Sequence, residues 1–448
     1  MEATPRLQPP HNIALLPPPT FLGHLIPFIE LAKKLVFQHN CTITLIILDD
    51  DDLPENASAE LLVSIRLTRS FPALRDTLTS LKELGTSAAA LVVDLFAIDA
   101  IDIAKQFGIQ LTFFHVIATY ELSLSVLLPK LDESCTSEYR DMVDPITLPG
   151  SIVLSPEDLP DSLKERNSEV HKWAIDWCNK FLEADGVMVN SFLELELEAF
   201  KDLERRLPGV PPVYPVGPLI RTGTEAESDA GSECVKWLND QPPKSVLFVS
   251  FGSGGTLSVQ QFKELALGLE MCGQRFLWVV RTPQASAADA YLNTQSTVKD
   301  PLDYLPEGFL ERTKGRGLVV VSWAPQIQVL SHRSTGGFVT HCGWNSILES
   351  AAFGVPLIAW PLCFEHRMNA VFLTDGLKGA IRVKPNENGV VGREQIAELV
   401  QRLMEGEEGN QIQKRMTDVK IAAGNALSPE GSSTKALAHV VQQWINWK

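Results

Sequence analysis

Residues 323–366 read WAPQIQVLSHRSTGGFVTHCGWNSILESAAFGVPLIAWPLCFEH, and this stretch decides the fold. Its middle begins with a β-rich run, Gly336–His341, passes through a glycine-containing turn at residues 342–344, and becomes amphipathic from Asn345 to Ala352. These patterns predict a strand that feeds a helix through a tight turn. Such a turn can hold an anion, because the first-turn N–H groups lack intrahelical partners and the helix dipole favours negative charge.

Three polar side chains at the start of this predicted helix favour one kind of anion. Asn345 and Ser346 are expected at capping positions, from which both can also donate to phosphate oxygens. Glu349 lies one turn further on the same helix face, where its carboxylate can accept hydrogen bonds from the vicinal hydroxyls of a ribose. The spacing therefore predicts a site for a diphosphate nucleotide.

Short apolar strands alternate with amphipathic helices on both sides of this stretch. Continuous apolar strands separated by helices indicate parallel, doubly wound sheets, so the fold class is α/β. The predicted strands are Asn12–Leu16, Cys41–Leu48, Ala90–Phe96, Ile109–Phe114 and Gly186–Asn190 in the first half, and Ser245–Gly252, Phe276–Val280, Leu318–Trp323, Gly337–His341 and Pro356–Trp360 in the second.

A polar, acidic stretch at Arg221–Glu233 interrupts this alternation. It has no hydrophobic periodicity, which is typical of a linker. We therefore expect an N-terminal domain (1–220), a linker (221–233), a C-terminal domain that holds the nucleotide site (234–425) and a C-terminal helical tail (426–448).

The composition disfavours several classes of function. A chain of 448 residues with 45% hydrophobic content is long enough for two domains, and its net charge of −16 disfavours nonspecific binding to nucleic acid or to an anionic membrane. The N-terminus lacks the pattern of a signal peptide, and no apolar run approaches the ~20 residues of a membrane-spanning helix. The seven cysteines are scattered without metal-binding spacing, so we expect reduced thiols and a cytoplasmic protein.

A histidine and an aspartate follow two of the N-terminal strands. His24 comes after the strand at residues 12–16, and Asp94 ends the apolar run of the strand at residues 90–96. Because ligands of open α/β sheets lie at the carboxyl ends of the strands, both side chains are expected in one cleft. Histidine titrates near neutral pH, and a carboxylate behind it fixes its tautomer and stabilises the imidazolium. The pair is therefore suited to remove a proton from an attacking hydroxyl, with Asp99 as the alternative carboxylate.

The motifs W-A-P-Q, H-x-x-x-G-x-F-x-T-H-C-G-W-N-S-x-x-E-S and G-V-P-x-x-x-W-P resemble the donor-binding box of plant UDP-sugar glycosyltransferases. GHLIP around His24 is similar to the base motif of that family, and VVDLF around Asp94 to the motif of its partner carboxylate. The resemblance implies a GT-B fold, in which two doubly wound Rossmann-like domains face a cleft and the C-terminal helix crosses back to the N-terminal domain. It also implies inverting transfer of a sugar to a small phenolic or other lipophilic acceptor that the N-terminal domain binds. LVVDLF, LPKLDE and PVYPVGPL resemble the branch that acts on phenylpropanoids and simple phenols.

The resemblance assigns a role to each residue of the donor site. Uracil would contact Trp323, Ala324 and Gln326; ribose would contact Glu349; the diphosphate would contact Ser253, His341, Gly343, Asn345 and Ser346; the sugar would contact Trp344 and Glu365. UDP-sugar is then a co-substrate, and no metal cofactor is expected, because the acidic run Asp49–Asp52 has no supporting ligands. The chain is expected to act as a monomer.

Four features depart from the family pattern. The box ends in His366, where glucose-using members usually carry glutamine and some galactose- or arabinose-using members carry histidine. The loop before His24 (PPPTFLG) contains fewer glycines than usual. His115–Tyr120 (HVIATY) replaces a stretch in which the family often places a threonine near O6 of the sugar, and Ile117 or Ala118 would make no such hydrogen bond. Only 13 residues separate Asp52 from Arg66, which is short for the usual third strand and loop.

Alternatives therefore stay open at this point. The donor is predicted to be UDP-glucose, with UDP-galactose or a UDP-pentose as the alternative that His366 raises. The acceptor atom is a hydroxyl or an amine. A nucleotide-binding protein with little activity is the alternative from another class. An NAD-dependent oxidoreductase is disfavoured, because no G-x-G-x-x-G motif follows the first strand.

Overall fold

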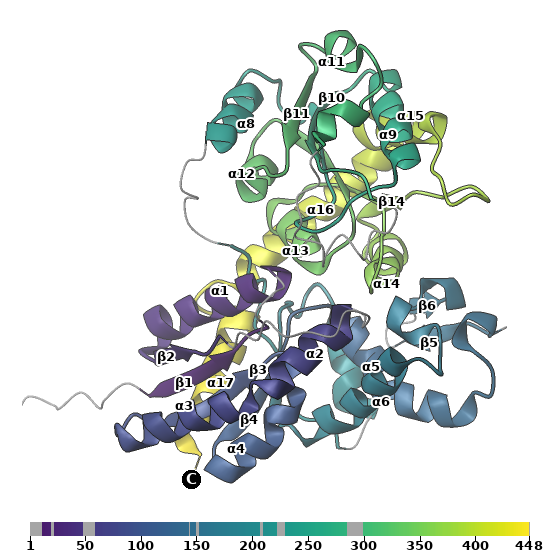
Figure 1. The fold of residues 1–448 in the computed structure, drawn as a ribbon. Helices are drawn as coiled ribbons and strands as arrows, with labels where there is room; N and C mark the ends of the chain where they lie inside the picture. Colours follow the sequence, from purple (N-terminus) through teal and green to yellow (C-terminus); the bar gives the residue numbers. More distant parts are fainter. Residues whose placement is uncertain are drawn as a thin grey trace, which may run out of the picture.

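The computed structural model describes residues 11–18, 22–47, 59–142, 144–148, 152–206, 209–221, 229–284 and 299–447. Within these ranges it contains two six-stranded sheets, each flanked by helices (Figure 1). The Asp49–Asp52 run, most of the predicted linker and part of the loop before His24 lie outside the described residues.

The N-terminal sheet is parallel throughout, with the strand order β2-β1-β3-β4-β7-β8. Every side chain of β1, β4 and β7 is buried, as expected for strands with helices on both faces of their sheet. The strands are β1 (Asn12–Leu16), β2 (Thr42–Leu45), β3 (Ala88–Val93), β4 (Gln110–His115), β7 (Gly186–Val189) and β8 (Val213–Pro215).

The C-terminal sheet is also parallel, with the order β11-β10-β9-β12-β13-β14. Thr340 at the end of β12 pairs with Ser250 of β9 and Ala359 of β13, so these three strands end level with one another. The residues that follow these three strands therefore lie together at one edge of the sheet. The strands are β9 (Val246–Ser250), β10 (Arg275–Val280), β11 (Gly317–Val321), β12 (Thr335–Thr340), β13 (Leu357–Ala359) and β14 (Ala380–Arg382).

Helices occupy most of the sequence between the strands. In the N-terminal half they are α1 (Leu22–His39), α2 (Ala59–Arg69), α3 (Phe71–Glu83), α4 (Ile101–Phe107), α5 (Thr119–Ser134), α6 (Glu169–Lys180) and α7 (Leu197–Arg206). In the C-terminal half they are α8 (Asp229–Asn239), α9 (Val259–Met271), α11 (Phe309–Arg312), α12 (Gln326–Ser331), α13 (Trp344–Phe353), α14 (His366–Val371), α15 (Arg393–Glu405), α16 (Glu407–Ala426) and α17 (Ser432–Asn446).

The last helix, α17, returns to the N-terminal domain (Figure 1). Leu437 and Trp444 of α17 lie in one apolar cluster with Ile13 of β1 and Phe28 of α1. The indole N–H of Trp444 donates to the Thr112 hydroxyl over 2.8 Å. The crossover of the C-terminal helix and the α/β class with two doubly wound domains, both predicted from the sequence, are confirmed.

Several element boundaries differ from the prediction. The helix of the central stretch begins at Trp344 and not at Asn345, because Gly343 adopts the extended conformation of the N-cap. The strand predicted to reach Phe96 ends at Val93. The side chain of Asp94 there accepts a hydrogen bond from the Phe96 N–H and caps a 3₁₀ helix, η1 (Leu95–Ala100).

Two further elements were not expected. Residues 229–233, predicted as the end of the linker, are the first turns of α8. Residues 146–154 carry an antiparallel pair, β5 (Ile146–Leu148) and β6 (Ile152–Leu154). Strands of three residues are too short to show a period of two in the sequence.

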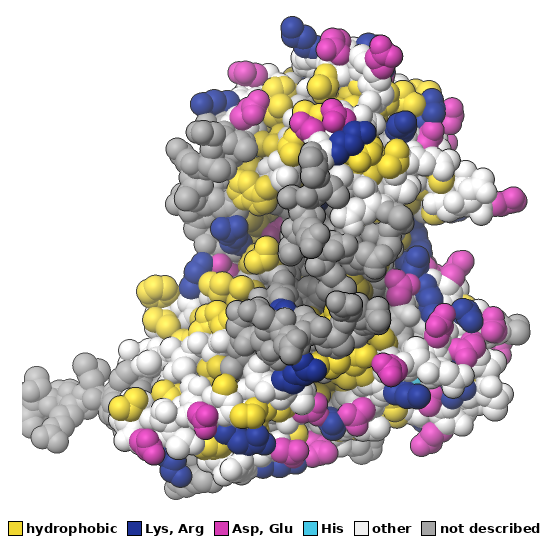
Figure 2. Space-filling view, in the orientation of Figure 1, with side chains coloured by type: hydrophobic (Ala, Val, Ile, Leu, Met, Phe, Trp, Pro, Cys, Tyr) yellow, Lys and Arg dark blue, Asp and Glu magenta, His cyan; other side chains and the backbone are white. Residues whose placement is uncertain are grey.

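The surface carries charges of both signs. On the face drawn in Figure 2, acidic and basic side chains are interspersed over both domains. The seven cysteines are all free thiols, and six of them are buried. None of the helices in the described ranges combines the length and the apolar character that crossing a membrane requires.

Candidate active site

The histidine and the aspartate predicted from the sequence are in direct contact. Nδ1 of His24 lies 2.8 Å from Oδ2 of Asp94. His24 is in the first turn of α1, after β1, and Asp94 follows β3, the neighbour of β1 in the sheet. The Asp94 side chain is fully buried, whereas 18% of the His24 side chain is exposed. His24 is therefore the member of the pair that can touch a ligand. The alternative carboxylate, Asp99, forms an ion pair with Lys180.

Hydrogen bonding and charge fix the state of both groups. The Phe96 N–H donates to Oδ1 of Asp94 over 3.2 Å, which leaves Oδ2 to face His24. Burial opposes protonation of His24, but the charge of Asp94, its hydrogen bond and the charge of Glu365 outweigh burial and raise the pKa of His24 above its ordinary value. A neutral His24 that donates from Nδ1 to Asp94 carries its lone pair on Nε2.

Aromatic side chains pack beside His24. The ring of Phe96 lies 5.5 Å from that of His24, and the Trp173 ring of α6 stacks on Phe96 at 5.7 Å and 17°. The Trp173 indole N–H donates to the Ser64 hydroxyl of α2 over 3.0 Å, which fixes the stack. Flat apolar walls of this kind suit an aromatic molecule. Sequence reasoning missed both residues, since nothing in their local pattern separates them from ordinary core aromatics.

The turn between β12 and α13 is built around His341. A methyl group added to Gly252 would lie 2.6 Å from the imidazole, and one added to Gly343 would overlap it from another side. Gly252 and Cys342 both have positive φ, at 79° and 70°, so each marks a sharp change of direction after its strand. The two glycines therefore let the turns after β9 and β12 approach the same imidazole.

A second imidazole packs against the first. The His366 ring lies edge-on to that of His341, with the ring centroids 4.8 Å apart. Burial lowers the pKa of His341 to about 4, and burial with the neighbouring His341 and Arg367 charges lowers the pKa of His366 as well. Both rings are therefore neutral near pH 7. The Cys363 N–H donates to Nδ1 of His366, so His366 carries its proton on Nε2.

The residues expected at the base and the ribose lie together. Nε2 of Gln326 donates to the Ser346 hydroxyl over 3.0 Å and to Oε2 of Glu349 over 2.5 Å. Trp323 follows β11 and is 41% exposed, while Ala324 is buried. The exposed Trp323 side chain and the Glu349 carboxylate of α13 thus lie at the same edge of the sheet. Gln326, which follows Trp323 closely in sequence, links the two segments through its hydrogen bonds to α13.

Trp344 makes a different contact from the one its predicted role requires. Its indole N–H donates to the carbonyl of Asn190, after β7 of the other domain, over 2.8 Å, and its side chain is buried. Asn190 also exchanges hydrogen bonds with the backbone of Leu219. The Trp344 side chain therefore ties the two domains together, and its predicted contact with the sugar stays a prediction.

Glu365 is held by an asparagine that sequence reasoning missed. Asn369, buried one turn along α14, donates from Nδ2 to the Cys342 carbonyl over 2.9 Å and to Oε1 of Glu365 over 3.4 Å. The separation of four residues from Glu365 to Asn369 on a short helix was the available signal. The hydrogen bonds link the carboxylate to the turn that carries His341.

The two halves of the site meet directly. Nδ2 of Asn345 donates to the carbonyl of Gly23, the residue before His24, over 2.6 Å. Gly23 and Asn345 are 322 positions apart in the sequence, and this hydrogen bond places the His24–Asp94 pair beside the N-terminus of α13. Asn345 is the second residue of α13, and its side chain contacts the N-terminal domain, which differs from the capping role expected of it.

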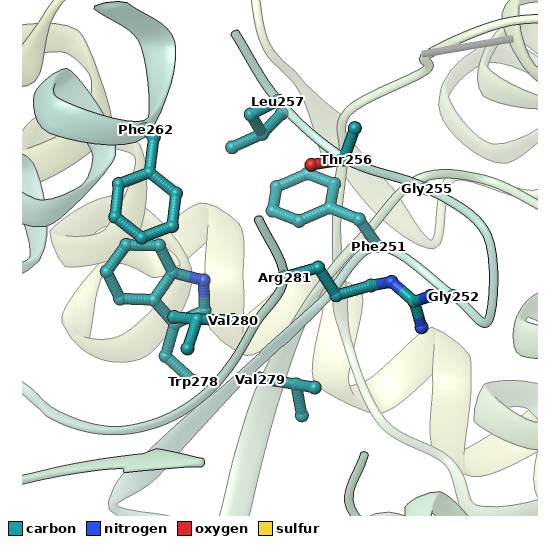
Figure 3. Close-up of a pocket in the computed structure, with 10 residues that line it drawn as sticks. All are labelled: Phe251, Gly252, Gly255, Thr256, Leu257, Phe262, Trp278, Val279, Val280 and Arg281. Carbon is teal, nitrogen blue, oxygen red and sulfur yellow. The ribbon is translucent and has the colours of Figure 1, made fainter. Parts of the chain in front are cut away.

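A pocket lies at the carboxyl ends of β9 and β10 (Figure 3). Phe251, Gly252 and Gly255 line it from the loop after β9, and the Arg281 side chain extends toward Gly252 in the close-up. Ser253, in the turn after β9, is exposed. The loop also approaches the turn between β12 and α13, since Gly252 lies against the His341 ring.

The described residues contain no group of three or more His, Cys, Asp and Glu side chains that could hold a metal ion. The site combines a histidine, a buried carboxylate in contact with it and a helix N-terminus beside them. Together with two facing parallel α/β sheets, these features define a GT-B glycosyltransferase that uses a nucleotide sugar.

Comparison with known proteins gives the family. Residues 214–408 match the model of the UDP-glucoronosyl and UDP-glucosyl transferase family. Over its full length the chain is 48% identical to the hydroquinone glucosyltransferase of Rauvolfia serpentina, 99% of which is covered. The chain belongs to the plant UDP-glycosyltransferase family and is an enzyme of that type.

Two solved structures are similar over almost the whole chain. Phytolacca americana UGT2, complexed with UDP-2-fluoro-glucose and pterostilbene, superposes with a TM-score of 0.88 at 40% identity and covers 97% of this chain and 100% of its own. The Polygonum tinctorium glucosyltransferase that acts on indoxyl, in complex with 3,4-dichloroaniline, gives 0.88 at 43% identity and covers 98% and 100%.

Proposed function

We propose that this enzyme transfers glucose from UDP-glucose to a hydroxyl of a small phenolic acceptor, with inversion at the anomeric carbon and with His24 as the general base. The observation that carries the proposal is the 2.8 Å contact between His24 and the buried Asp94, set beside the α13 N-terminus by the Asn345–Gly23 hydrogen bond. The relatives that glucosylate hydroquinone and indoxyl support an aromatic acceptor.

The reaction needs one proton transfer and one displacement. Nε2 of His24 takes the proton of the acceptor hydroxyl while its oxygen bonds to the anomeric carbon. The bond from that carbon to the β-phosphate oxygen breaks, and UDP leaves with the electron pair. Asp94 stabilises the imidazolium through its hydrogen bond to Nδ1. Because the acceptor attacks the face opposite the leaving group, the configuration inverts.

The donor site neutralises the charge that develops on UDP. The first-turn N–H groups of α13, together with Ser346 and Ser253, donate to the diphosphate, and the neutral His341 lies beside them. Leaving-group charge is stabilised there without an acid. Trp323 stacks on uracil, with the Ala324 backbone and Gln326 at its edge, and Glu349 binds the ribose hydroxyls. In this proposal Glu365 and His366 contact the sugar.

A donor panel tests the proposal. UDP-glucose, UDP-galactose, UDP-xylose and UDP-arabinose are each incubated with hydroquinone and with a flavonol, and product masses are measured together with UDP release. We expect UDP-glucose to dominate. If the wild-type protein prefers UDP-galactose or a UDP-pentose, and His366→Gln shifts that preference toward UDP-glucose, then His366 determines the choice of donor. Tight UDP binding without turnover of any donor would reject the transferase proposal.

An aromatic amine is the second candidate acceptor. The Polygonum tinctorium relative was captured with 3,4-dichloroaniline, which carries an amine on an aromatic ring of phenol size. 3,4-Dichloroaniline in the same panel should give an N-glucoside, and its absence would restrict the enzyme to hydroxyls.

The remaining parts of the proposal concern organisation. We infer an acceptor-binding domain of residues 1–220, a donor domain of residues 234–425 and a C-terminal helix that belongs to the former, acting as a cytoplasmic monomer without a metal. The free thiols support a reducing compartment. Light scattering measures the mass in solution, and unchanged turnover after EDTA treatment and dialysis is expected of a metal-independent enzyme.

A further inference from the structure

Asp161 of the acceptor domain holds the backbone turn from which Glu365 and His366 project. It begins the 3₁₀ helix η5 (Asp161–Leu163), which packs on α6. Oδ2 of Asp161 accepts the Phe364 N–H over 3.0 Å, and the Asp161 N–H donates to the Phe364 carbonyl over 3.3 Å. Both polar backbone groups of one donor-domain residue are therefore engaged by one acceptor-domain residue.

The held residue has an unusual conformation. Phe364 has a φ of 54°, in the left-handed region that a non-glycine residue adopts only at a cost. The two hydrogen bonds from Asp161 favour this conformation over an extended one. Oδ1 of Asp161 also pairs with Arg367 over 2.6 Å, on the far side of the Glu365–His366 dipeptide. The dipeptide is thus fixed at both ends.

Ring contacts continue from this turn to the diphosphate site. The Phe364 ring lies edge-on to that of His366, at a centroid distance of 6.0 Å, and His366 lies edge-on to His341 at 4.8 Å. A change in the Phe364 conformation would move the first of these rings directly. The acceptor domain can therefore influence the sugar end of the donor site through Asp161.

We propose that Asp161 is a positioning residue for the donor sugar: by holding Phe364 and Arg367 across the domain boundary, it orients Glu365 and His366 toward the hexose. The inference rests on the proposed contacts of Glu365 and His366 with the sugar. It ties recognition of the hexose, but not of the UDP moiety, to the closed arrangement of the two domains.

The chain offers a matched control. Asp158, three residues earlier, forms an ion pair with Arg382 of β14 over 2.6 Å and accepts the Ser155 hydroxyl. Like Asp161 with its partner Arg367, Asp158 spans the boundary between the two domains through a carboxylate–guanidinium ion pair. However, its partner Arg382 is separated in sequence from the turn that carries Glu365. Replacement of Asp158 weakens domain contact without releasing Phe364.

The experiment compares binding of UDP-glucose with binding of UDP by calorimetry, for the wild-type protein, Asp161→Ala, Asp161→Asn and Asp158→Ala. We expect Asp161→Ala to weaken the binding of UDP-glucose by about tenfold, which corresponds to loss of one or two hydrogen bonds. The binding of UDP should weaken by less than about twofold. Asp161→Asn keeps an acceptor for the Phe364 N–H and should recover part of the loss. Asp158→Ala should weaken both ligands by the same factor.

Turnover adds a second measurement. In Asp161→Ala the ratio of kcat/KM for UDP-glucose over UDP-galactose should fall, whereas Asp158→Ala should keep the wild-type ratio. Equal weakening of UDP and UDP-glucose by Asp161→Ala, or the same selective loss in Asp158→Ala, would overturn the inference. Because the calorimetric comparison needs no acceptor, it decides the role of Asp161 even if the proposed transfer reaction fails.

Discussion

Replacing Asp94 by asparagine should damage catalysis more than replacing it by alanine. The Phe96 N–H donates to Oδ1 of Asp94, so an asparagine at this position places its carbonyl there and turns its amide NH₂ toward His24. The amide then donates to Nδ1, and the proton of the neutral imidazole moves to Nε2. Nε2 loses the lone pair that receives the acceptor proton. Alanine removes the carboxylate without imposing the wrong tautomer.

The magnitude follows from the buried, charge-assisted hydrogen bond between His24 and Asp94. A hydrogen bond to a charged group contributes about 1.5–3 kcal/mol, so loss of imidazolium stabilisation should lower kcat/KM roughly 10- to 150-fold in Asp94→Ala. The kcat/KM of Asp94→Asn should be lower than that of Asp94→Ala. KM for UDP-glucose should change little in either variant, since Asp94 lies in the acceptor domain.

The assay is the pH dependence of kcat/KM with a phenol whose own pKa is about 10, so that only the enzyme titrates between about pH 5 and pH 8.5. The base must be neutral, so the wild-type rate rises as the pH passes through the raised pKa of His24. In Asp94→Ala the charge and the hydrogen bond of Asp94 are gone, whereas burial, which lowers the pKa of His24, and the weaker effect of the Glu365 charge remain. The acid limb should therefore move to lower pH, with a lower plateau.

Asp99→Asn is the matched control, because Asp99 pairs with Lys180 and not with His24. It should keep the wild-type rate and pH profile. The reasoning would be refuted if Asp94→Asn were as active as the wild type or more active than Asp94→Ala. An acid limb of Asp94→Ala at the wild-type position would refute the assignment of the raised pKa to Asp94.

Three other outcomes are expected. Gly343→Ala should weaken UDP at least about tenfold in calorimetry, because its methyl group overlaps the His341 ring, whereas Gly424→Ala, where no heavy atom lies within 4 Å, should leave UDP affinity unchanged. His341 has a pKa of about 4 in the folded state, so the free energy of unfolding in urea should fall by about 2 kcal/mol more between pH 7 and pH 5 in the wild type than in His341→Gln. Trp444→Ala should lower that free energy by about 3–5 kcal/mol at pH 7, whereas Trp447→Ala, at a half-exposed position, should change it by less than about 0.5 kcal/mol.

The sequence predicted the core of the site because local patterns define it. A β-rich run, a glycine turn and an amphipathic helix are set by residues close in sequence, and the turn after β12 forms where the pattern indicates. The His24–Asp94 pair was also predictable, since the carboxyl ends of neighbouring parallel strands meet at one edge of a sheet. The helix cap was less predictable: the N-cap of α13 is Gly343, two residues before Asn345, where the cap was expected.

Contacts across the domain boundary were beyond such reasoning. Trp344 donates to Asn190 and Asn345 to Gly23, so two residues assigned to ligand contacts by motif also carry the interface between domains. Asp161 belongs to no recognisable motif, and its hydrogen bond with the Phe364 N–H depends on how the two domains face each other. The sequence by itself determined the two α/β domains, the turn between β12 and α13 and the pairing of His24 with Asp94, because each depends on short-range patterns and strand order. Only the tertiary structure decided which side chains join the domains, because those contacts depend on geometry between residues up to several hundred positions apart.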